Sequence, residues 1–391
     1  MPGHKLRVNL SQRPHILFLP SWYPVQGNEL NGIFNRELAC LLQEGADISL
    51  LHLHFTDHPG KTRVLHFREN ADVSETIVYL NPGGGMVFRQ WRYFRHFFKS
   101  VREITEKWGN IDAIHVQVAW KMGLPAMYYS WKYKIPLLVT EHYTGYLKKD
   151  GSLRGWKKWM CRWILRRANV VTAVSPGLAM AIQELGVKHV EVIPNFPDPV
   201  FLLGNVANNK SQNEFYFLHI SNFDDRQKQT SWIIREFIYL KKIHPHIRLM
   251  LVVPELKLED FFAEHPNLSS EGIVFCEPTD NKNIYRSRFE NANAVVSFSK
   301  FETFGITLLE SLCCGVPVIY TTCGGPENFV EPDMGIEANA EDPDSLYKAM
   351  EDMIQRGNWD SQSIATRTRN KFKSDTIRNR YMELYRSIMK K

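Results

Sequence analysis

A chain of 391 residues is too long for one ordinary hydrophobic core, so its length predicts two domains. Hydrophobic residues make up 44% and charged residues 23%, the composition of a globular protein rather than a disordered or fibrous one. No apolar run reaches the roughly 18 to 20 residues of a membrane span, and the first residues lack the apolar core of a secretion signal. The six cysteines form no Cys-x-x-Cys pair, which favours a reducing cytoplasm over disulfides or a zinc site.

The net charge of +6 is unevenly distributed along the chain. Residues 1–200 carry about 25 Lys and Arg against about 16 Asp and Glu, whereas the remainder carries about 23 against about 26. This asymmetry indicates that the first half of the chain faces an anionic partner.

The first half alternates short apolar strands with amphipathic helices. Strands are expected at 15–20, 46–55, 111–117, 135–142, 169–175 and 189–195, and helices at 32–45, 88–108, 121–132, 155–168 and 176–185. Continuous apolar strands separated by helices predict a parallel sheet that is covered on both faces.

Residues 196–214 interrupt this alternation with prolines, asparagines and a polar run, and are interpreted as an interdomain linker. The alternation then resumes. Strands are expected at 215–222, 247–253, 273–277, 293–299 and 317–322, and helices at 229–243, 257–264, 280–290 and 305–314. The predicted fold class is therefore α/β, with two Rossmann-like domains facing a cleft, the first at 1–198 and the second at 199–374.

The stretch SKFETFGITLLESL, at 299–312, combines a strand end, a turn and a helix start. The amides of Phe304, Gly305 and Ile306 would begin that helix unpaired, in the arrangement that binds phosphate. Glu310, further into the helix, could accept the hydroxyls of a ribose, and Glu302, before the helix, those of a second sugar. One carboxylate for each sugar, with phosphate between them, is the layout of a bound nucleotide sugar. The alternative is that Glu310 faces solvent and Glu302 merely caps the helix.

The longer stretch FETFGITLLESLCCGVPVIYTTCGGPE resembles the E-x7-E region of family 4 GT-B glycosyltransferases, which are retaining enzymes that use nucleotide sugars. The resemblance is dense over about thirty residues and weaker over most of the chain. It implies that the first domain binds the acceptor and the second the nucleotide. It also implies that the last helix, 375–391, packs back on the first domain.

Two further segments resemble the same family. In PSWYPVQGNELNGIF, Gly32 takes the place of the loop glycine that lets the diphosphate approach. In LLVTEHYTG, His142 takes the place of the histidine that lies against the donor phosphates and sugar. An ordinary turn glycine and a structural histidine are the alternatives. Phe196 departs from the family, because it replaces a glycine of the hinge.

The loop after the strand at 215–222 departs further from the family. Lys228 matches the lysine that grips the pyrophosphate, but Asn222 and Phe223 stand where an arginine is usual. Arg226 is the nearest substitute, and a solvated turn is the alternative for both cations. No residues show metal-ligand spacing, so no metal and no cofactor are expected, and Lys228, Arg226 and the helix amides would neutralise the leaving diphosphate.

Two stretches, 88–108 and 146–167, are rich in both basic and aromatic residues. Such residues suit contact with an anionic membrane. They also suit single-stranded nucleic acid, or helices whose aromatics face the core while their charges are solvated. The favoured interpretation is a cytoplasmic protein that lies peripherally on the inner face of the plasma membrane.

Taken together, the residues and the resemblance imply a retaining hexosyltransferase of polysaccharide biosynthesis. Its donor would be a UDP-sugar, with a GDP-sugar second, and its acceptor a hydroxyl of a glycan or lipid-linked glycan. A nucleotide-sugar 2-epimerase is one alternative, since it shares the two-domain architecture. A nucleic-acid-binding protein is the other, although it leaves the placing of Glu302 and Glu310 unexplained, so no nucleic-acid partner is expected.

Overall fold

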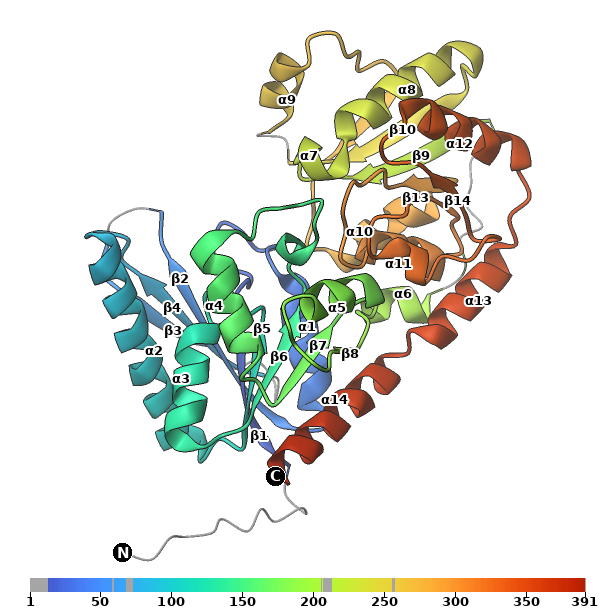
Figure 1. Ribbon diagram of the computed structural model, residues 1–391. Coiled ribbons are helices and arrows are strands. Elements are labelled where there is room, and N and C mark those ends of the chain that lie inside the picture. Colours follow the sequence, from blue (N-terminus) through green and yellow to red (C-terminus); the bar gives the residue numbers. More distant parts are fainter. Residues whose placement is uncertain are drawn as a thin grey trace, which may run out of the picture.

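The structure, a computed structural model, describes residues 13–57, 60–67, 73–204, 206, 213–254 and 257–390. Two sheets with helices on both faces form two domains (Figure 1). The sheets have strand orders β3-β4-β2-β1-β5-β6-β7-β8 and β11-β10-β9-β12-β13-β14, and neighbouring strands are parallel except β3 and β4. The predicted α/β class with two parallel-sheet domains is confirmed.

The first domain has the larger sheet. Its strands are β1 His15–Pro20, β2 Asp47–Phe55, β3 Arg63–Phe67, β4 Ser74–Leu80, β5 Ala113–Gln117, β6 Leu137–Glu141, β7 Val170–Ala173 and β8 Glu191–Val192. Its helices are α1 Ile33–Gln43, α2 Met86–Trp108, α3 Gly123–Tyr133, the 3-10 turn η1 Thr144–Tyr146, α4 Gly155–Leu165 and α5 Pro176–Gln183.

The second domain follows a short helix, α6 Pro199–Leu203. Its strands are β9 Phe215–Ile220, β10 Ile247–Val252, β11 Ile273–Cys276, β12 Ala294–Val296, β13 Val318–Thr321 and β14 Gly335–Ala338. Its helices are α7 Asp225–Lys228, α8 Thr230–Ile243, α9 Leu258–Glu264, α10 Lys282–Glu290, α11 Ile306–Cys313, the 3-10 turn η3 Pro326–Asn328 and α12 Pro343–Arg356; α13 Ser361–Lys371 and α14 Ser374–Met389 end the chain.

Sequence patterns do not reveal several local features, among them β14, α12 and α13. Strands β3 and β4 are not evident from the sequence, because charged residues interrupt the apolar run between 63 and 80. The predicted linker contains α6, which Asp198 caps by accepting a hydrogen bond from the Val200 amide at 2.9 Å. Residues 205 and 207–212 of that linker, and Lys391 of the predicted last helix, lie outside the described residues.

The C-terminal helix lies against the first domain rather than the second. From α12 the chain runs through α13 to α14, which returns along the lower part of the molecule in Figure 1. There Ile377, Tyr381 and Tyr385 are buried with Ile16 of β1 and Leu38 of α1 in one apolar cluster. Helices α2, α3, α4 and α5 cover the opposite face of this sheet.

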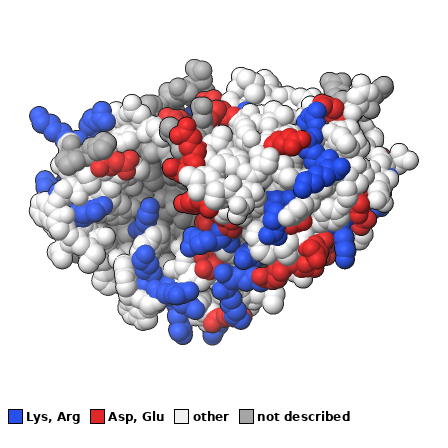
Figure 2. All heavy atoms as spheres, turned by 90° about the horizontal axis from the view of Figure 1, so that it is seen from above, with Lys and Arg blue, Asp and Glu red and all other residues white. Residues whose placement is uncertain are grey.

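The carboxyl ends of the two sheets face each other, and contacts between the domains occur there. The Ser175 hydroxyl, which caps α5, donates to the Gly324 carbonyl at 2.9 Å, after β13 of the other sheet. The surface is hollowed in the view from above, with Lys and Arg along one side of the hollow and Asp and Glu along another (Figure 2). Among the described residues, no helix is long and apolar enough to cross a membrane.

Candidate active site

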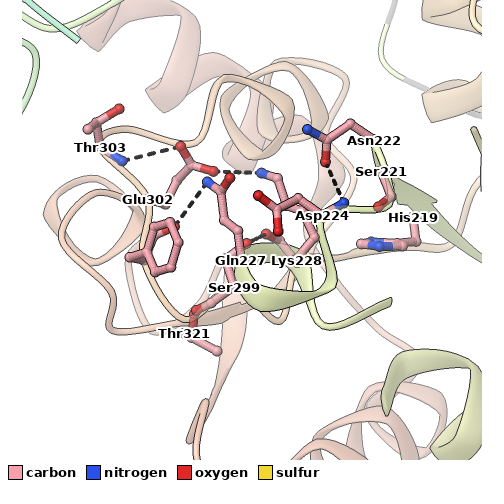
Figure 3. A network of polar contacts seen from close by, with 12 residues as sticks. His219, Ser221, Asn222, Asp224, Gln227, Lys228, Ser299, Glu302, Thr303 and Thr321 are labelled. Atoms are coloured by element: carbon pink, nitrogen blue, oxygen red, sulfur yellow. Dashed lines mark hydrogen bonds and ion pairs between the residues drawn. The ribbon is translucent and has the colours of Figure 1, made fainter. Parts of the chain in front are cut away.

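A partly buried ion pair lies at the carboxyl edge of the second sheet. The Lys228 Nζ and a carboxylate oxygen of Glu302 are 2.6 Å apart, and only 20% and 15% of their side chains are exposed. The second carboxylate oxygen accepts the Thr303 amide at 3.2 Å. The close-up shows both side chains extending toward each other, Lys228 from the end of α7 and Glu302 from the loop after β12 (Figure 3). Two of the residues predicted for the site are therefore brought into direct contact.

Hydrogen bonds between the two loops fix this pair. The Gln227 side chain donates to the Phe301 carbonyl at 3.1 Å, and the Lys300 amide donates to the Gln227 carbonyl at 2.9 Å. Gln229 is buried and donates to the Phe298 carbonyl at 2.9 Å. Because the loop after β9 is bonded to the loop after β12, Lys228 is held over Glu302 by the fold.

Arg226 is not brought to this pair. Its side chain is 84% exposed and pairs with Asp224 at 3.2 Å, two residues away. The Asn222 side chain closes a tight turn by accepting the Asp224 amide at 3.1 Å. The structure therefore places Lys228, and not Arg226, against Glu302.

The start of α11 offers unpaired backbone donors beside the ion pair. Gly305 is the residue before the helix and has φ +94°, a left-handed conformation that favours glycine. Within the described chain, the amides of Phe304, Gly305 and Ile306 donate no hydrogen bond. Such amides at a helix start, together with the helix dipole, suit an anionic group.

Glu310 faces the protein interior, which excludes the solvent-facing alternative. Only 6% of the residue is exposed, and its carboxylate accepts the Tyr285 hydroxyl at 2.9 Å. Burial raises its pKa to about 8, although the hydrogen bond from Tyr285 opposes the shift. The carboxyl group is therefore largely protonated at neutral pH.

Gly32 lies where only glycine fits. It precedes α1 with φ +67°, and a Cβ atom there would lie 2.5 Å from the Trp22 carbonyl oxygen. The Asn35 side chain donates to the same carbonyl at 2.8 Å and so fixes the loop. The helix thus begins with its backbone close to the preceding strand end.

His142 directly follows β6 and is almost completely buried. Its ring lies 4.8 Å from that of Phe34, and its Nε2 lies 2.8 Å from the Gln117 side chain. Burial lowers its pKa to about 3, so the ring is neutral. His142 and Glu37 of α1 line one small cavity within the first domain and the C-terminal helix that packs on it.

A charged cluster that sequence reasoning missed joins the domains beside Glu310. Lys282 of α10 donates to the Glu37 carboxylate and lies 2.9 Å from that of Asp198. Burial raises the pKa of Glu37 to about 7, against the opposing effect of Lys282. The signal was available, because position 37 shares the apolar face of the predicted helix with Phe34.

Glu141 is a second residue that the sequence did not reveal. It is fully buried and accepts the Ala119 amide at 2.9 Å and the Tyr146 hydroxyl at 2.7 Å. Burial raises its pKa to about 7. These bonds tie the loop after β6, which carries His142, to the loop after β5. In the described part of the chain, no cluster of three or more His, Cys, Asp or Glu could hold a metal ion.

Two family models match most of the chain. A model described as Glycosyltransferase Family 4 matches residues 36–201, and one described as Glycosyl transferases group 1 matches residues 214–356. The chain belongs to the family 4 GT-B glycosyltransferases. Of the three classes that the sequence left open, the glycosyltransferase is therefore the correct one, and the named synthases among its relatives indicate a hexosyltransferase.

Curated relatives and solved structures agree with this assignment. N-acetyl-alpha-D-glucosaminyl L-malate synthase of Bacillus anthracis is 26% identical over 324 residues, covering 78% of this chain and 82% of the relative. Sucrose-phosphate synthase from Thermosynechococcus elongatus superimposes with a TM-score of 0.73 at 19% identity, covering 96% and 99% of the two chains. Anabaena Alr3699/HepE, solved in complex with UDP and glucose, gives 0.71 at 17% identity, covering 96% and 100%. At these identities the two structures establish the fold alone.

The buried carboxyl of Glu310 predicts a dependence of stability on pH. Its pKa is about 8 in the folded protein and 4.5 ordinarily. Between these values the folded protein holds a proton that the unfolded chain has released, so the free energy of unfolding falls as pH rises. Glu310→Gln removes this pH-dependent loss of stability. The loss is at most about 1.4 kcal/mol for each unit by which the folded-state pKa exceeds the ordinary one.

Denaturant unfolding of Glu310→Gln and wild type at pH 5, 7 and 9 measures the effect. The variant should gain stability relative to wild type from pH 5 to 9. Exposed Glu383→Gln, on α14, is the matched control and should show no such trend. A constant difference between Glu310→Gln and wild type across the range would show that Glu310 titrates normally.

Proposed function

We propose that the protein is a retaining glycosyltransferase that moves a hexose from a nucleotide diphosphate sugar, with UDP favoured over GDP. The acceptor is a hydroxyl of a glycan or lipid-linked glycan in polysaccharide biosynthesis. The observation that carries the proposal is the pairing of Lys228 with Glu302 beside the free amides that begin α11. Glu310 lies further along the same helix, where its carboxylate is the acceptor proposed for the ribose hydroxyls.

Relatives support the choice of donor. One solved neighbour holds UDP and glucose, and another, a trehalose-6-phosphate protein from E. coli, holds UDP-2-fluoro glucose. Alpha-monoglucosyldiacylglycerol synthase of Streptococcus pneumoniae is 25% identical over 254 residues, covering 59% of this chain and 56% of the relative. Its name points to a lipid acceptor, which favours a lipid-linked acceptor here.

In this proposal the incoming diphosphate competes for Lys228. Phosphate on the amides of Phe304, Gly305 and Ile306 draws the ammonium group away from Glu302. Glu302 is then free to accept hydroxyls of the transferred sugar, while Lys228 stabilises the charge that develops on the leaving diphosphate. No side chain acts as a covalent nucleophile. The leaving phosphate takes the proton of the acceptor hydroxyl, which attacks from the same face.

The helices on one face of the first sheet support contact with a membrane. Exposed aromatic side chains extend from three neighbouring helices: Phe88 and Trp91 of α2, Trp131 of α3, and Trp156 and Trp159 of α4. The contribution of α3 was not foreseen from the sequence. Aromatic and basic side chains together suit the interface of an anionic bilayer, so a cytoplasmic protein bound peripherally to the inner face of the plasma membrane follows from this proposal.

Incubation with UDP- and GDP-sugars, with and without membrane extract, tests the reaction. Release of nucleotide diphosphate should depend on the extract and should continue in EDTA, because Lys228 and helix amides replace a metal. Release that needs added magnesium or manganese would contradict this account of the leaving group. Isomerised donor without transfer would indicate an epimerase instead.

The two glutamates should affect different steps. Glu310→Ala should weaken binding of free nucleotide diphosphate by roughly tenfold, because the ribose loses an acceptor worth about 1.5 kcal/mol. Glu302→Gln should lower kcat more than nucleotide affinity, since its partner is the transferred sugar. Calorimetry and steady-state rates separate the effects, with Glu383→Gln as control, and equal losses of nucleotide affinity in both variants would refute the division.

Binding to liposomes should need anionic lipid and fall as salt rises. Each basic residue near the surface contributes about 1 kcal/mol, and about 1 M salt reduces the Debye length to about 3 Å. The test variant replaces by glutamine four exposed basic residues of α4 and its end: Lys157, Lys158, Arg166 and Arg167. The matched control replaces exposed lysines elsewhere: Lys242, Lys348, Lys371 and Lys373.

Only the first variant should lose most of its sedimentation with anionic liposomes, and both should bind nucleotide normally. If the α4 variant sediments as the wild type does, its basic residues are a solvated helix face. The acceptor would then be the next candidate for the anionic partner of the first domain.

A further inference from the structure

A chain of buried polar side chains connects the C-terminal helix to His142. The Tyr385 hydroxyl lies 2.6 Å from His115 Nδ1, and His115 Nε2 lies 2.8 Å from the end of the Gln117 amide that is assigned as the nitrogen. The other end of that amide lies 2.8 Å from His142 Nε2. All four residues are buried, so each hydrogen must be assigned to a partner within this chain.

The hydroxyl proton of Tyr385 determines which groups in this series of hydrogen bonds donate and which accept. The residue is fully buried, and in the described part of the structure His115 Nδ1 is the hydroxyl's one hydrogen-bond partner. If the hydroxyl accepted a hydrogen bond from His115, its own proton would be buried without an acceptor, which is unfavourable. Tyr385 therefore donates, and His115 Nδ1 accepts.

His115 accepts on Nδ1 and therefore donates from Nε2. Burial lowers its pKa well below the ordinary value, so the ring is neutral and carries its one proton on Nε2. That nitrogen lies 2.8 Å from both Thr140 Oγ1 and the Gln117 amide, and both must accept a hydrogen bond from it. Thr140 can do so, because its own proton has an acceptor in Thr172 Oγ1 at 2.7 Å.

The Gln117 amide must then present its oxygen to His115. The two orientations of a glutamine amide have almost the same shape, so the surrounding hydrogen bonds decide between them. With the oxygen toward His115, the amide NH2 faces His142 and donates to its Nε2. We propose that Gln117, oriented through His115 by Tyr385 of the C-terminal helix, is a positioning residue that holds His142 as the neutral ring with its proton on Nδ1.

This tautomer determines what His142 can do. In the part of the chain that the structure describes, its Nδ1 makes no hydrogen bond. The nitrogen left for a ligand is therefore a donor and suits an oxygen of the sugar or its phosphate. This consequence rests on the proposed function, whereas the tautomer itself does not. The tautomer also gives α14 a role beyond packing, because the Tyr385 hydroxyl on that helix orients His142 of the candidate site.

Nitrogen NMR of protein carrying 15N-labelled histidine tests the inference without any activity measurement. The two ring nitrogens give well-separated signals according to which one is protonated, and His142→Asn identifies the signals of His142. The expected spectrum has a protonated Nδ1 and an unprotonated Nε2 at neutral pH. The reverse pattern in wild type would overturn the proposal, whatever reaction the protein performs.

Three variants test the pathway. Tyr385→Phe removes one hydroxyl, and should lower the Nδ1-protonated population of His142. Tyr381→Phe, on the same face one turn earlier, is the matched control, because its hydroxyl reaches Thr140 only at 3.4 Å and makes no hydrogen bond to His115 among the described residues. Gln117→Glu is nearly isosteric but can only accept, so it should move the proton of His142 to Nε2.

Kinetics provide a separate reading. Tyr385→Phe should lower kcat by roughly tenfold, as loss of a supporting hydrogen bond does for other positioned imidazoles, with the KM for donor unchanged. Tyr381→Phe should retain wild-type kcat. An unchanged His142 spectrum in both Tyr385→Phe and Gln117→Glu would refute the proposal. An altered spectrum with unchanged kcat would uphold the tautomer and refute the role of His142 in transfer.

Discussion

The facing carboxyl ends of two parallel sheets are the constraint on which the candidate site depends. Each strand of a parallel sheet delivers its following loop to the same edge, so Lys228 and Glu302 meet at the edge of the second sheet, and His142 follows a strand at the facing edge of the first. The ion pair between Lys228 and Glu302, at 2.6 Å, is a direct result. Neither side chain would have a partner if its loop ended at a different edge.

Burial gives this region its electrostatic character. The pKa of Glu310 is raised to about 8, and those of Glu37 and Glu141 to about 7, because each carboxyl is removed from water. Such groups are costly to bury unless a ligand or a cation compensates them. Lys282 compensates Glu37 and Asp198 across the domain boundary, so the same cluster that supports the site also joins the domains.

The polar chain from Tyr385 to His142 shows a different use of burial. Neutral hydrogen-bonding groups in a dry environment have few ways to satisfy every donor and acceptor. A single hydroxyl on α14 therefore sets the orientation of three further side chains. The last helix thus contributes apolar packing to the first domain and also orients polar side chains that lead to His142.

Features set by local sequence were predictable. The glycine before α11, the place of Glu310 within that helix and the place of Lys228 after the first strand of the second domain follow from strand ends, helix spacing and the family resemblance. Contacts between distant segments were not. Lys282 and Gln117 carry no local signal, since their importance arises from Glu37 and His142, which lie far away in the sequence. Arg226 failed to reach Glu302 because a tight turn at Asn222 directs it to Asp224.

Amide hydrogen exchange with and without bound nucleotide tests the central claim most directly. Calorimetry first selects UDP or GDP, whichever binds. The account predicts slower exchange of the unpaired amides of Phe304, Gly305 and Ile306, and of the loop that carries Lys228, when the nucleotide is bound. Nucleotide binding that leaves exchange in both loops unchanged, and slows it elsewhere, would contradict a donor site at the start of α11.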